Sequence, residues 1–297
     1  MNSGYLSAAE RPLILRIIDF PLVALVVAVL LFLVANTLGV IFGKFIPAVG
    51  ATATAAIQGL VTIGFVFATY KYAISRLGEQ PRDDLPADGA ARQAGAGLLV
   101  GTILFSVVAA IAAALGVYRV TGWDYLAPIL SILIGSALVP ALVEEVLFRG
   151  ILFRWIEDFG GTWAALVTSS ALFGAAHLLN PQATWFSSFA IAVFGGLLLG
   201  GAYMLTRSLW MPIGLHAAWN FTQGAIFGVP ISGHQSEGLL RAELQGPPIL
   251  SGSGFGLEAS IITIVIASGA GVWLVKRAVR RGRLVQPWWQ RQYRAGT

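Results

Sequence analysis

Residues 126–150 read LAPILSILIGSALVPALVEEVLFRG, and this stretch decides how the chain folds. Its first eighteen residues, 126–143, carry no charge, which is long enough for a helix to span a bilayer. Two adjacent carboxylates, Glu144 and Glu145, and then Arg149 follow in the same apolar run. A charge inside a bilayer costs roughly 2.5–3.5 kcal/mol on insertion scales, so charged residues there are paired, face the protein interior and mark a functional site.

The two carboxylates need different explanations. Arg149 follows Glu145 by four residues on the same helix face, which predicts a structural ion pair. Glu144 points about 100° away from Glu145 on a helix. The ion pair therefore leaves Glu144 unexplained.

The composition is that of a polytopic membrane protein. Of the 297 residues, 57% are hydrophobic and 11% are charged, whereas an average soluble domain is about 25% charged. The 35 glycines suit helices that approach closely in a membrane. The chain has no cysteine, which excludes disulfides, thiolate metal ligands and a cysteine nucleophile. Its basic residues flank apolar stretches, so anionic lipid is the expected partner and no nucleic acid is expected.

Eight apolar stretches predict an all-α fold with about eight transmembrane helices. They cover about 13–40, 48–74, 94–117, 126–155, 163–179, 185–205, 211–227 and 257–275. The first is too long for a signal-peptide core and is expected to stay uncleaved. A tight turn at 158–162 separates the fourth and fifth spans. We expect three parts: N-terminal helices at 1–125, a catalytic core at 126–228, and an outer loop, last helix and basic cytoplasmic tail at 229–297.

Eight spans would place both termini on one side of the membrane. With the termini inside, 16 of the 19 Lys and Arg residues fall on the inner side, counting Arg11, Arg149 and Arg154 among them. This bias predicts cytoplasmic termini. We expect the chain to lie in the plasma membrane of a prokaryote. The basic tail from Lys276 is expected either to lie along the inner leaflet or to form a solvated flank.

Further polar residues occur in the later spans. His177 ends the fifth span, and His216 and Asn220 lie four residues apart on one face of the seventh. His234 is interpreted as an ordinary residue of the outer loop. A lone membrane histidine often only bonds a neighbouring helix, but here two histidines, an amide and two carboxylates fall on three helices, which favours a site.

Residue counting tests whether these side chains can meet. Glu144 precedes the turn at Gly160 by 16 residues and His177 follows it by 17, so both lie roughly 24–26 Å from the turn of an antiparallel hairpin. His216 lies only four residues past Pro212, near the inner end of its helix. The three can converge only if the hairpin projects beyond the inner face. We expect a site in the inner half of the membrane.

Pro140 precedes the two carboxylates and acts on the backbone. It frees the carbonyl of Ser136 and kinks the helix. The kink is expected to widen a cavity for substrate and water.

Glu144-Glu145-x-x-x-Arg149, Phe173-x-x-x-His177 and His216-x-x-x-Asn220 resemble, in this order, three motifs of the CPBP family of intramembrane proteases. This family, also called ABI, includes type II CAAX prenyl endopeptidases and bacteriocin-processing or immunity-like bacterial proteins. The resemblance covers about 131–227. It implies an endopeptidase that acts on a membrane-associated or lipidated protein or peptide.

The resemblance also implies roles for these residues. Glu144 would activate a water molecule as general base, and His177 would help to hold that water. His216 and Asn220 would donate hydrogen bonds to the oxyanion. Glu145, Arg149 and Phe173 would have supporting roles. The Glu145–Arg149 pair would fix the helix that carries Glu144 and Glu145, which we call the motif helix.

Three alternatives stay open. Glu144, His177 and His216 are also a possible zinc set, which would make the protein a metalloprotease. A mechanism without a cofactor is favoured, because the chain has no His-Glu-x-x-His motif and Asn220 is a poor zinc ligand. The second alternative is a non-catalytic immunity or binding member of the family. The third is a transporter with a proton relay, which the lack of visible internal repeats disfavours.

Overall fold

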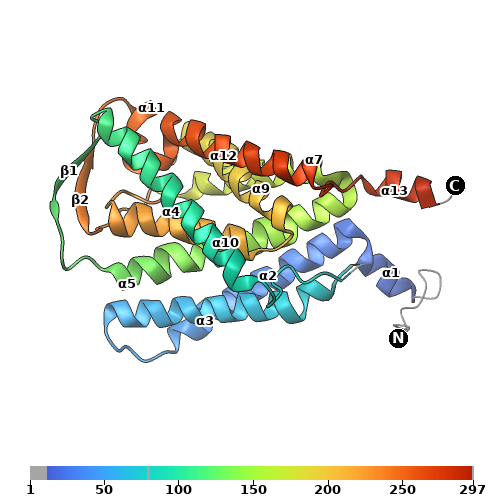
Figure 1. The fold of residues 1–297 in the computed structure, drawn as a ribbon. Helices are drawn as coiled ribbons and strands as arrows, with labels where there is room; N and C mark the ends of the chain where they lie inside the picture. The colour runs from blue at the N-terminus through green and yellow to red at the C-terminus, as the bar shows by residue number, and fades with distance from the viewer. Residues whose placement is uncertain (1–11, 79–80, 296–297) are drawn as a thin grey trace.

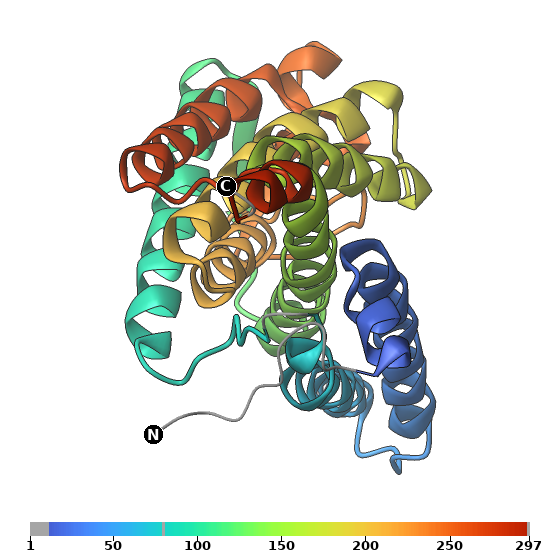
Figure 2. The same ribbon diagram turned by 90° about the vertical axis from the view of Figure 1, so that its right-hand side faces the viewer.

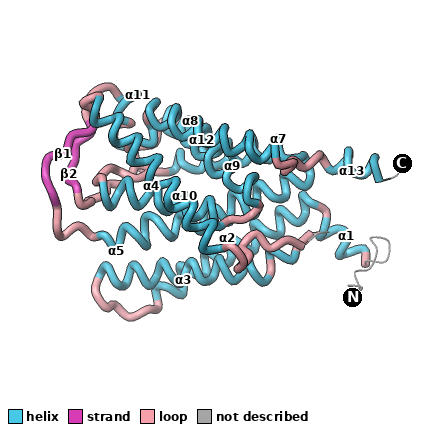
Figure 3. Tube along the Cα trace, viewed as in Figure 1, coloured by secondary structure: helices cyan, strands magenta, loops and turns pink. Residues whose placement is uncertain are grey.

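The structure is a computed structural model that describes residues 12–78 and 81–295. Most of this chain is helical, and the long helices run along a common direction (Figure 1). The helices α1 (Leu13–Asp19) and α13 (Trp288–Ala295) lie at one end, which we call the terminal face. The strands β1 (Tyr118–Trp123) and β2 (Leu240–Leu244) lie at the other end, which we call the strand face (Figure 3). The expected all-α membrane fold is confirmed.

The strand pair is the part of the fold that the sequence did not predict. β1 and β2 are antiparallel, with Tyr118 opposite Leu244. Both segments lay in stretches expected to be loops. β1 is rich in aromatic and β-branched residues, which suit a strand, but its partner lies more than 100 residues away in the sequence. Such pairing leaves no local pattern.

Six helical stretches of the described chain are long and apolar enough to cross a membrane. They include α2 (Pro21–Lys44), a stretch with α3 (Ala51–Tyr72) and η1 (Ile74–Arg76), α4 (Ala90–Ala114), and α12 (Ile261–Arg280). The other two are Ile129–Leu179 and Trp185–Thr206, the latter built from α8 (Trp185–Ala190), η5 (Ile191–Gly195) and α9 (Gly196–Thr206). Large apolar side chains such as Val26 and Leu30 of α2 are exposed on their outer surfaces, where lipid would cover them.

The number of membrane-spanning stretches differs from the predicted eight for two reasons. The stretch Ile129–Leu179 is a single run of 51 residues by this criterion, yet it folds back on itself. Phe148 of its first arm contacts Phe173 of its second, with ring centroids 4.9 Å apart. In addition, α10 (Trp210–Phe221) has 12 residues and continues into η6 (Thr222–Ile226), so it is shorter than the other spans. The count of eight therefore stays a prediction.

The hairpin reverses at the predicted turn. Its first arm consists of α5 (Ile129–Ser131), η2 (Ile132–Leu138), α6 (Val139–Glu145), η3 (Val146–Phe153) and the start of α7 (Arg154–Ala176). Gly161 breaks α7 with φ 84° and ψ 170°, a conformation that glycine adopts readily. The second arm ends in η4 (His177–Leu179). The segments η2, η3, η5 and η6 are π-helical, a distortion frequent at functional sites.

Glycines bring α10 against α4. A Cβ atom at Gly97 would lie 2.2 Å from the carbonyl oxygen of Met211, and one at Gly101 would lie 2.4 Å from that of Leu215. Only glycine allows two helix backbones to approach this closely. On the opposite flank, α2 and α3 form a pair beside the hairpin (Figure 2).

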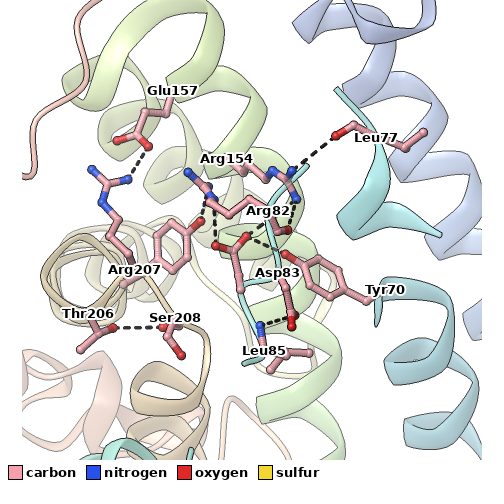
Figure 4. Close-up of polar contacts among 12 residues, drawn as sticks. Tyr70, Leu77, Arg82, Asp83, Leu85, Arg154, Glu157, Thr206, Arg207 and Ser208 are labelled. Atoms are coloured by element: carbon pink, nitrogen blue, oxygen red, sulfur yellow. Dashed lines mark hydrogen bonds and ion pairs between the residues drawn. The ribbon is translucent and has the colours of Figure 1, made fainter. Parts of the chain in front are cut away.

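The polar loop between α3 and α4 folds inward and closes the terminal face. Its Asp84 is fully buried; Tyr70 donates to Asp84 Oδ2 at 2.7 Å, and Arg82 Nε lies 2.9 Å from Oδ1. Arg82 also donates to the hydroxyl of Tyr203 at 2.7 Å, and Arg154 donates to the carbonyl of Arg82 at 2.9 Å (Figure 4). We call these five residues the terminal-face cluster.

Two arginines counted as inner-side charges need correction. Arg149 and Arg154 are each 1% exposed, so they are internal partners of buried carboxylates and not charges of a flanking segment. Without these two, 14 of the remaining 17 Lys and Arg residues fall on the predicted inner side, so the basic bias keeps its direction. Arg11, which belongs to this count, lies outside the described residues.

The C-terminal segment docks on the hairpin tip at the terminal face. Val285 N donates to Thr162 Oγ1 at 2.8 Å, just after the break at Gly161. Trp288 of α13 stacks edge-on against Phe20 at 5.9 Å. This helix therefore lies beside α1 and α2 and not free of the protein.

Candidate active site

The depth of α10 explains how its polar residues reach the hairpin. A Cβ atom at Gly150 would lie 3.1 Å from the Leu209 side chain, which immediately precedes α10. His216 is seven residues beyond Leu209, and Glu144 is six residues before Gly150, so both lie about 10 Å from this level toward the strand face. The helix α10 begins beside Gly150 and not beside the turn at Gly161. The tip of the hairpin projects past the start of α10, which is the condition for Glu144, His177 and His216 to meet.

The four residues expected to be catalytic line one cavity. This cavity has a volume of about 450 Å³ and is lined by Glu144 from α6, His177 from η4, and His216 and Asn220 from α10. The cavity also borders α2, α3, η2 and the loop after η6. Segments from all three expected parts of the chain therefore contribute to it.

Glu144 presents a carboxylate oxygen without a partner. Its Oε2 atom is buried and has no hydrogen-bond partner among the described residues. The nearest ionisable contact is His216 Nε2 at 4.0 Å. A carboxylate oxygen in this position can accept a proton from a molecule in the cavity.

The backbone fixes the tautomer of His177. Its Nδ1 atom lies 2.8 Å from the carbonyl oxygen of Phe173, one helical turn earlier. Because a carbonyl only accepts, Nδ1 carries the hydrogen and Nε2 is an acceptor in the neutral ring. The Phe173 ring packs edge-on against His177 with centroids 4.7 Å apart, which holds the imidazole in place.

Glu145 binds two residues and not one. Its Oε1 atom accepts from Arg149 at 3.0 Å, as the four-residue spacing predicted, and lies 2.9 Å from His216 Nδ1. Glu145 is fully buried and Arg149 is 1% exposed. The carboxylate requires a hydrogen on His216 Nδ1. The other ring nitrogen, Nε2, is the atom that faces Glu144.

Arg149 connects the motif helix to two other segments. It donates to the carbonyl of Gly195 in η5 at 3.0 Å. Its guanidinium also lies over the ring of Phe173, 4.5 Å from the centroid, a favourable cation–π arrangement. Phe173 thus contacts the arginine, His177 and, at 6.3 Å, the ring of His216.

Asn220 bonds the carbonyl that Pro140 leaves free. Its Nδ2 donates to the carbonyl oxygen of Ser136 at 3.0 Å. Proline has no N–H to offer the residue four positions before it. One Asn220 N–H hydrogen is therefore used by the backbone, while the second hydrogen and the amide oxygen stay available at the cavity wall.

The expected position in the inner half of the membrane depends on which face is cytoplasmic, and it stays a prediction; within the fold, the cavity extends toward the strand face. The cavity reaches residues 231–235, in the loop after η6, and Asn36 and Val40 near the strand-face end of α2. It therefore lies in the half of the molecule away from the termini. The cause is the recessed start of α10, which shifts His216 toward the strand face.

Sequence reasoning missed two residues near the site. His234, interpreted as an ordinary loop residue, is exposed and lines the rim of the cavity. Glu258 of η8 (Leu257–Ala259) is 2% exposed and lines a smaller cavity of about 30 Å³ together with His177 and His216. That volume is enough for a water molecule. The signal for Glu258 was present, because this carboxylate lay inside the predicted span 257–275.

Glu258 holds the loop that forms the rim. It accepts a hydrogen bond from the backbone N–H of Ser232, and the carbonyl of Ser232 accepts from Asn180 at 3.2 Å. Ser232 has φ 47°, which is unusual for a residue other than glycine. Burial raises the pKa of Glu258 from its ordinary value of 4.5 to about 7. The last span begins three residues later, at Ile261.

The zinc alternative can be compared with these positions. His216 Nδ1 is bound to Glu145, which leaves Nε2 as its one possible ligand atom, 4.0 Å from Glu144 Oε2. Two ligand atoms at about 2.0–2.2 Å from one tetrahedral zinc ion would lie closer together, about 3.3–3.6 Å apart. Within residues 12–78 and 81–295, no three His, Cys, Asp or Glu side chains come together as a metal-binding group. As placed, Glu144, His177 and His216 do not fit a zinc ion.

Comparison with known proteins supports the motif assignment. Residues 126–222 match the family model of type II CAAX prenyl endopeptidase Rce1-like proteins. The matched region contains all three motifs, and it confirms the resemblance to the CPBP family over this part of the chain. A comparison with curated proteins finds no match. The family match supports an intramembrane protease of the CAAX type.

Proposed function

We propose that this protein, whose residues 126–222 match CAAX-type proteases, is an intramembrane endopeptidase that uses Glu144 as its general base. Its substrate is a membrane-associated or lipidated protein or peptide. The observation that carries the proposal is the unpartnered Oε2 of Glu144 in a cavity shared with His177, His216 and Asn220. A buried carboxylate oxygen without a hydrogen-bond partner costs free energy, and such a group within a membrane protein typically marks a functional site.

The proposed reaction is hydrolysis of a peptide bond by water. His177 Nε2 accepts one hydrogen bond from the water, and Glu144 takes its proton as the water oxygen bonds to the carbonyl carbon. The carbonyl oxygen becomes an oxyanion. Glu144 then gives the proton to the amide nitrogen, the C–N bond breaks, and the products are an amine and a carboxylic acid.

The proposed oxyanion donors are His216 and Asn220. With Nδ1 bound to Glu145, His216 can donate from Nε2 only when both ring nitrogens carry hydrogen. The negative charge of Glu145 stabilises that imidazolium. Asn220 adds its second N–H. Removing one such donor typically lowers kcat by about 10²–10³.

We also propose that the termini are cytoplasmic and that the chain lies in a prokaryotic plasma membrane. The bias of Lys and Arg toward the terminal face supports this orientation. The α13 segment lies at that face with exposed Trp289, and its arginines suit binding to anionic lipid.

The central test is Glu144→Gln in purified protein. We expect hydrolysis of a membrane-anchored peptide to fall by about 10²–10⁴. The readout is mass spectrometry of both cleavage products. Glu237→Gln, an exposed loop position, is the matched control and should keep full activity. Unchanged turnover in Glu144→Gln would rule out the proposed base.

A chelation experiment tests the metal-free mechanism separately. We expect activity to survive chelation, because the cavity residues as placed do not fit zinc. Activity lost on chelation and restored by added zinc would replace this mechanism with a metal-dependent one.

A further inference from the structure

We infer that substrate enters the catalytic cavity from the strand face, and that the cleaved segment of the substrate lies on the extracytoplasmic side of the membrane. This inference rests on the proposed function of the site and on the proposed cytoplasmic position of the termini. The substrate class is a membrane-anchored protein whose scissile segment follows its anchor outside the cytoplasm.

Several residues that line the rim of the cavity lie toward the strand-face end of their segments. Val40 is four residues before the end of α2 at Lys44. Gly135 lies six residues after the start of the first hairpin arm at Ile129, and Asn180 follows η4 directly. The loop that includes residues 231–235 closes the ring. Every one of these positions is far from the terminal face along its own segment.

The rim is open to the surroundings. Val40 is 45% exposed, and His234 and Gln235 are exposed loop residues that line the cavity. The loop that carries them is fixed, since Ser232 is held by Asn180 and Glu258. The entrance is therefore a defined part of the fold.

The terminal side of the site is closed. Leu209 and Ile151 are fully buried between the site and the terminal face. The terminal-face cluster lies beside them, since Leu209 N donates to the carbonyl of Asp84 at 2.7 Å, and Tyr70, Asp84 and Tyr203 of this cluster have no exposed surface. A peptide coming from this side would have to displace a buried, hydrogen-bonded ionic network, and removing one partner of a buried pair costs about 3–5 kcal/mol.

Charge decides which face is cytoplasmic. After the buried Arg149 and Arg154 are left out, 13 Lys and Arg residues of the described chain remain on the terminal side and three on the strand side. One of those three, Arg241, is paired with Asp124 at 3.0 Å. Cytoplasmic segments near membrane spans carry the excess of Lys and Arg. The open rim therefore faces away from the cytoplasm.

The absence of cysteine in the sequence allows a direct test. Gln235→Cys places a thiol at the rim, and Gln286→Cys places a matched thiol on an exposed residue of the terminal face. Intact cells that express each variant are treated with a charged, membrane-impermeant maleimide, before and after permeabilisation. Labelling in detergent confirms that both thiols react.

We expect Gln235→Cys to be labelled in intact cells and Gln286→Cys to gain label only after permeabilisation. The reverse pattern would overturn the inference, and so would labelling of both variants only after permeabilisation. None of these outcomes depends on catalysis.

Substrate identification then separates this inference from the proposed function. Membrane proteins that accumulate uncut in Glu144→Gln cells are sequenced, and the side of each cleavage site is mapped. Sites outside the cytoplasm support the inference, and sites in cytoplasmic tails contradict it. If no protein accumulates while Gln235→Cys is labelled from outside, the proposed endopeptidase function fails and the direction of access stands.

Discussion

His216 Nδ1 lies 2.9 Å from Glu145 Oε1, although the two residues are 71 positions apart in the sequence. The same oxygen accepts from Arg149 at 3.0 Å. Glu145 therefore joins the motif helix to α10 and sets the tautomer of the histidine that faces Glu144. The two adjacent carboxylates therefore differ in role. Glu145 holds the segments of the site together, and Glu144 is left open to the cavity.

This division predicts different effects for the two Glu→Gln substitutions. Glu145→Gln removes the charge that faces buried Arg149 and His216, so we expect a loss of about 3–5 kcal/mol in stability together with a loss of activity. Glu144→Gln should lose activity and leave stability nearly unchanged, because its Oε2 has no partner in the described chain. Thermal unfolding in detergent and peptide cleavage measure the two effects. Equal destabilisation by both substitutions would contradict the assignment.

The bond between Asn220 and Ser136 predicts coupling to Pro140. Asn220→Ala leaves the partly buried carbonyl of Ser136 without its side-chain partner, which should cost at most about 1–3 kcal/mol. In a Pro140→Ala background the restored N–H can bond Ser136, so the same change should cost less. A double-mutant cycle of thermal stabilities measures this coupling.

Activity separates the two roles of Asn220 in that cycle. If its second N–H stabilises the oxyanion, cleavage stays low in the double variant even where stability is recovered. Full recovery of cleavage would leave Asn220 with a backbone role alone.

The contact between α4 and α10 predicts a sharp contrast between two glycines on one helix. Gly97→Ala would place a Cβ atom 2.2 Å from the carbonyl oxygen of Met211, which must displace α10 and with it His216. We expect lower thermal stability and lower activity. Gly95→Ala meets no atom within 4 Å, so it should be neutral or stabilise the helix by about 0.5–1 kcal/mol. Similar losses in both variants would contradict the proposed packing.

Glu258 predicts a pH dependence of stability. Burial raises its pKa from 4.5 to about 7, so between these values the folded protein holds a proton that the unfolded chain releases. The stability contributed by protonated Glu258 is complete below about pH 4.5 and is lost as pH rises through about 7, by about 3 kcal/mol at most. The groups that face it are His216, Gln223 and Ser232.

Glu258→Gln should remove this dependence, because glutamine still accepts from the Ser232 N–H and carries no charge. Thermal unfolding between pH 5 and 8 compares this variant with the unmodified protein and with Glu243→Gln, a control on an exposed strand position. The gap in melting temperature should grow in favour of Glu258→Gln as pH rises. A constant gap would show that Glu258 does not titrate in this range.

Much of the site was predictable because it depends on local spacing. The four-residue interval between Glu145 and Arg149 gives an ion pair on any helix. The equal distances of Glu144 and His177 from the turn follow from the constant rise of a helix. The resemblance to three protease motifs added the order in which the polar residues occur, and the family match over residues 126–222 agrees with it.

The sequence by itself determined the apolar spans, the reversal near Gly161 and which polar residues belong to the candidate site. It could do so because helix length, turn chemistry and intramembrane charge are local properties. Only the tertiary structure decided that α10 starts beside Gly150, that His216 bonds Glu145, and that the loop held by Glu258 borders the cavity. These contacts depend on how far each helix slides along its neighbour, and glycine contacts between helices set that distance. A shift of a few residues would leave every local pattern intact and would take His216 away from Glu144.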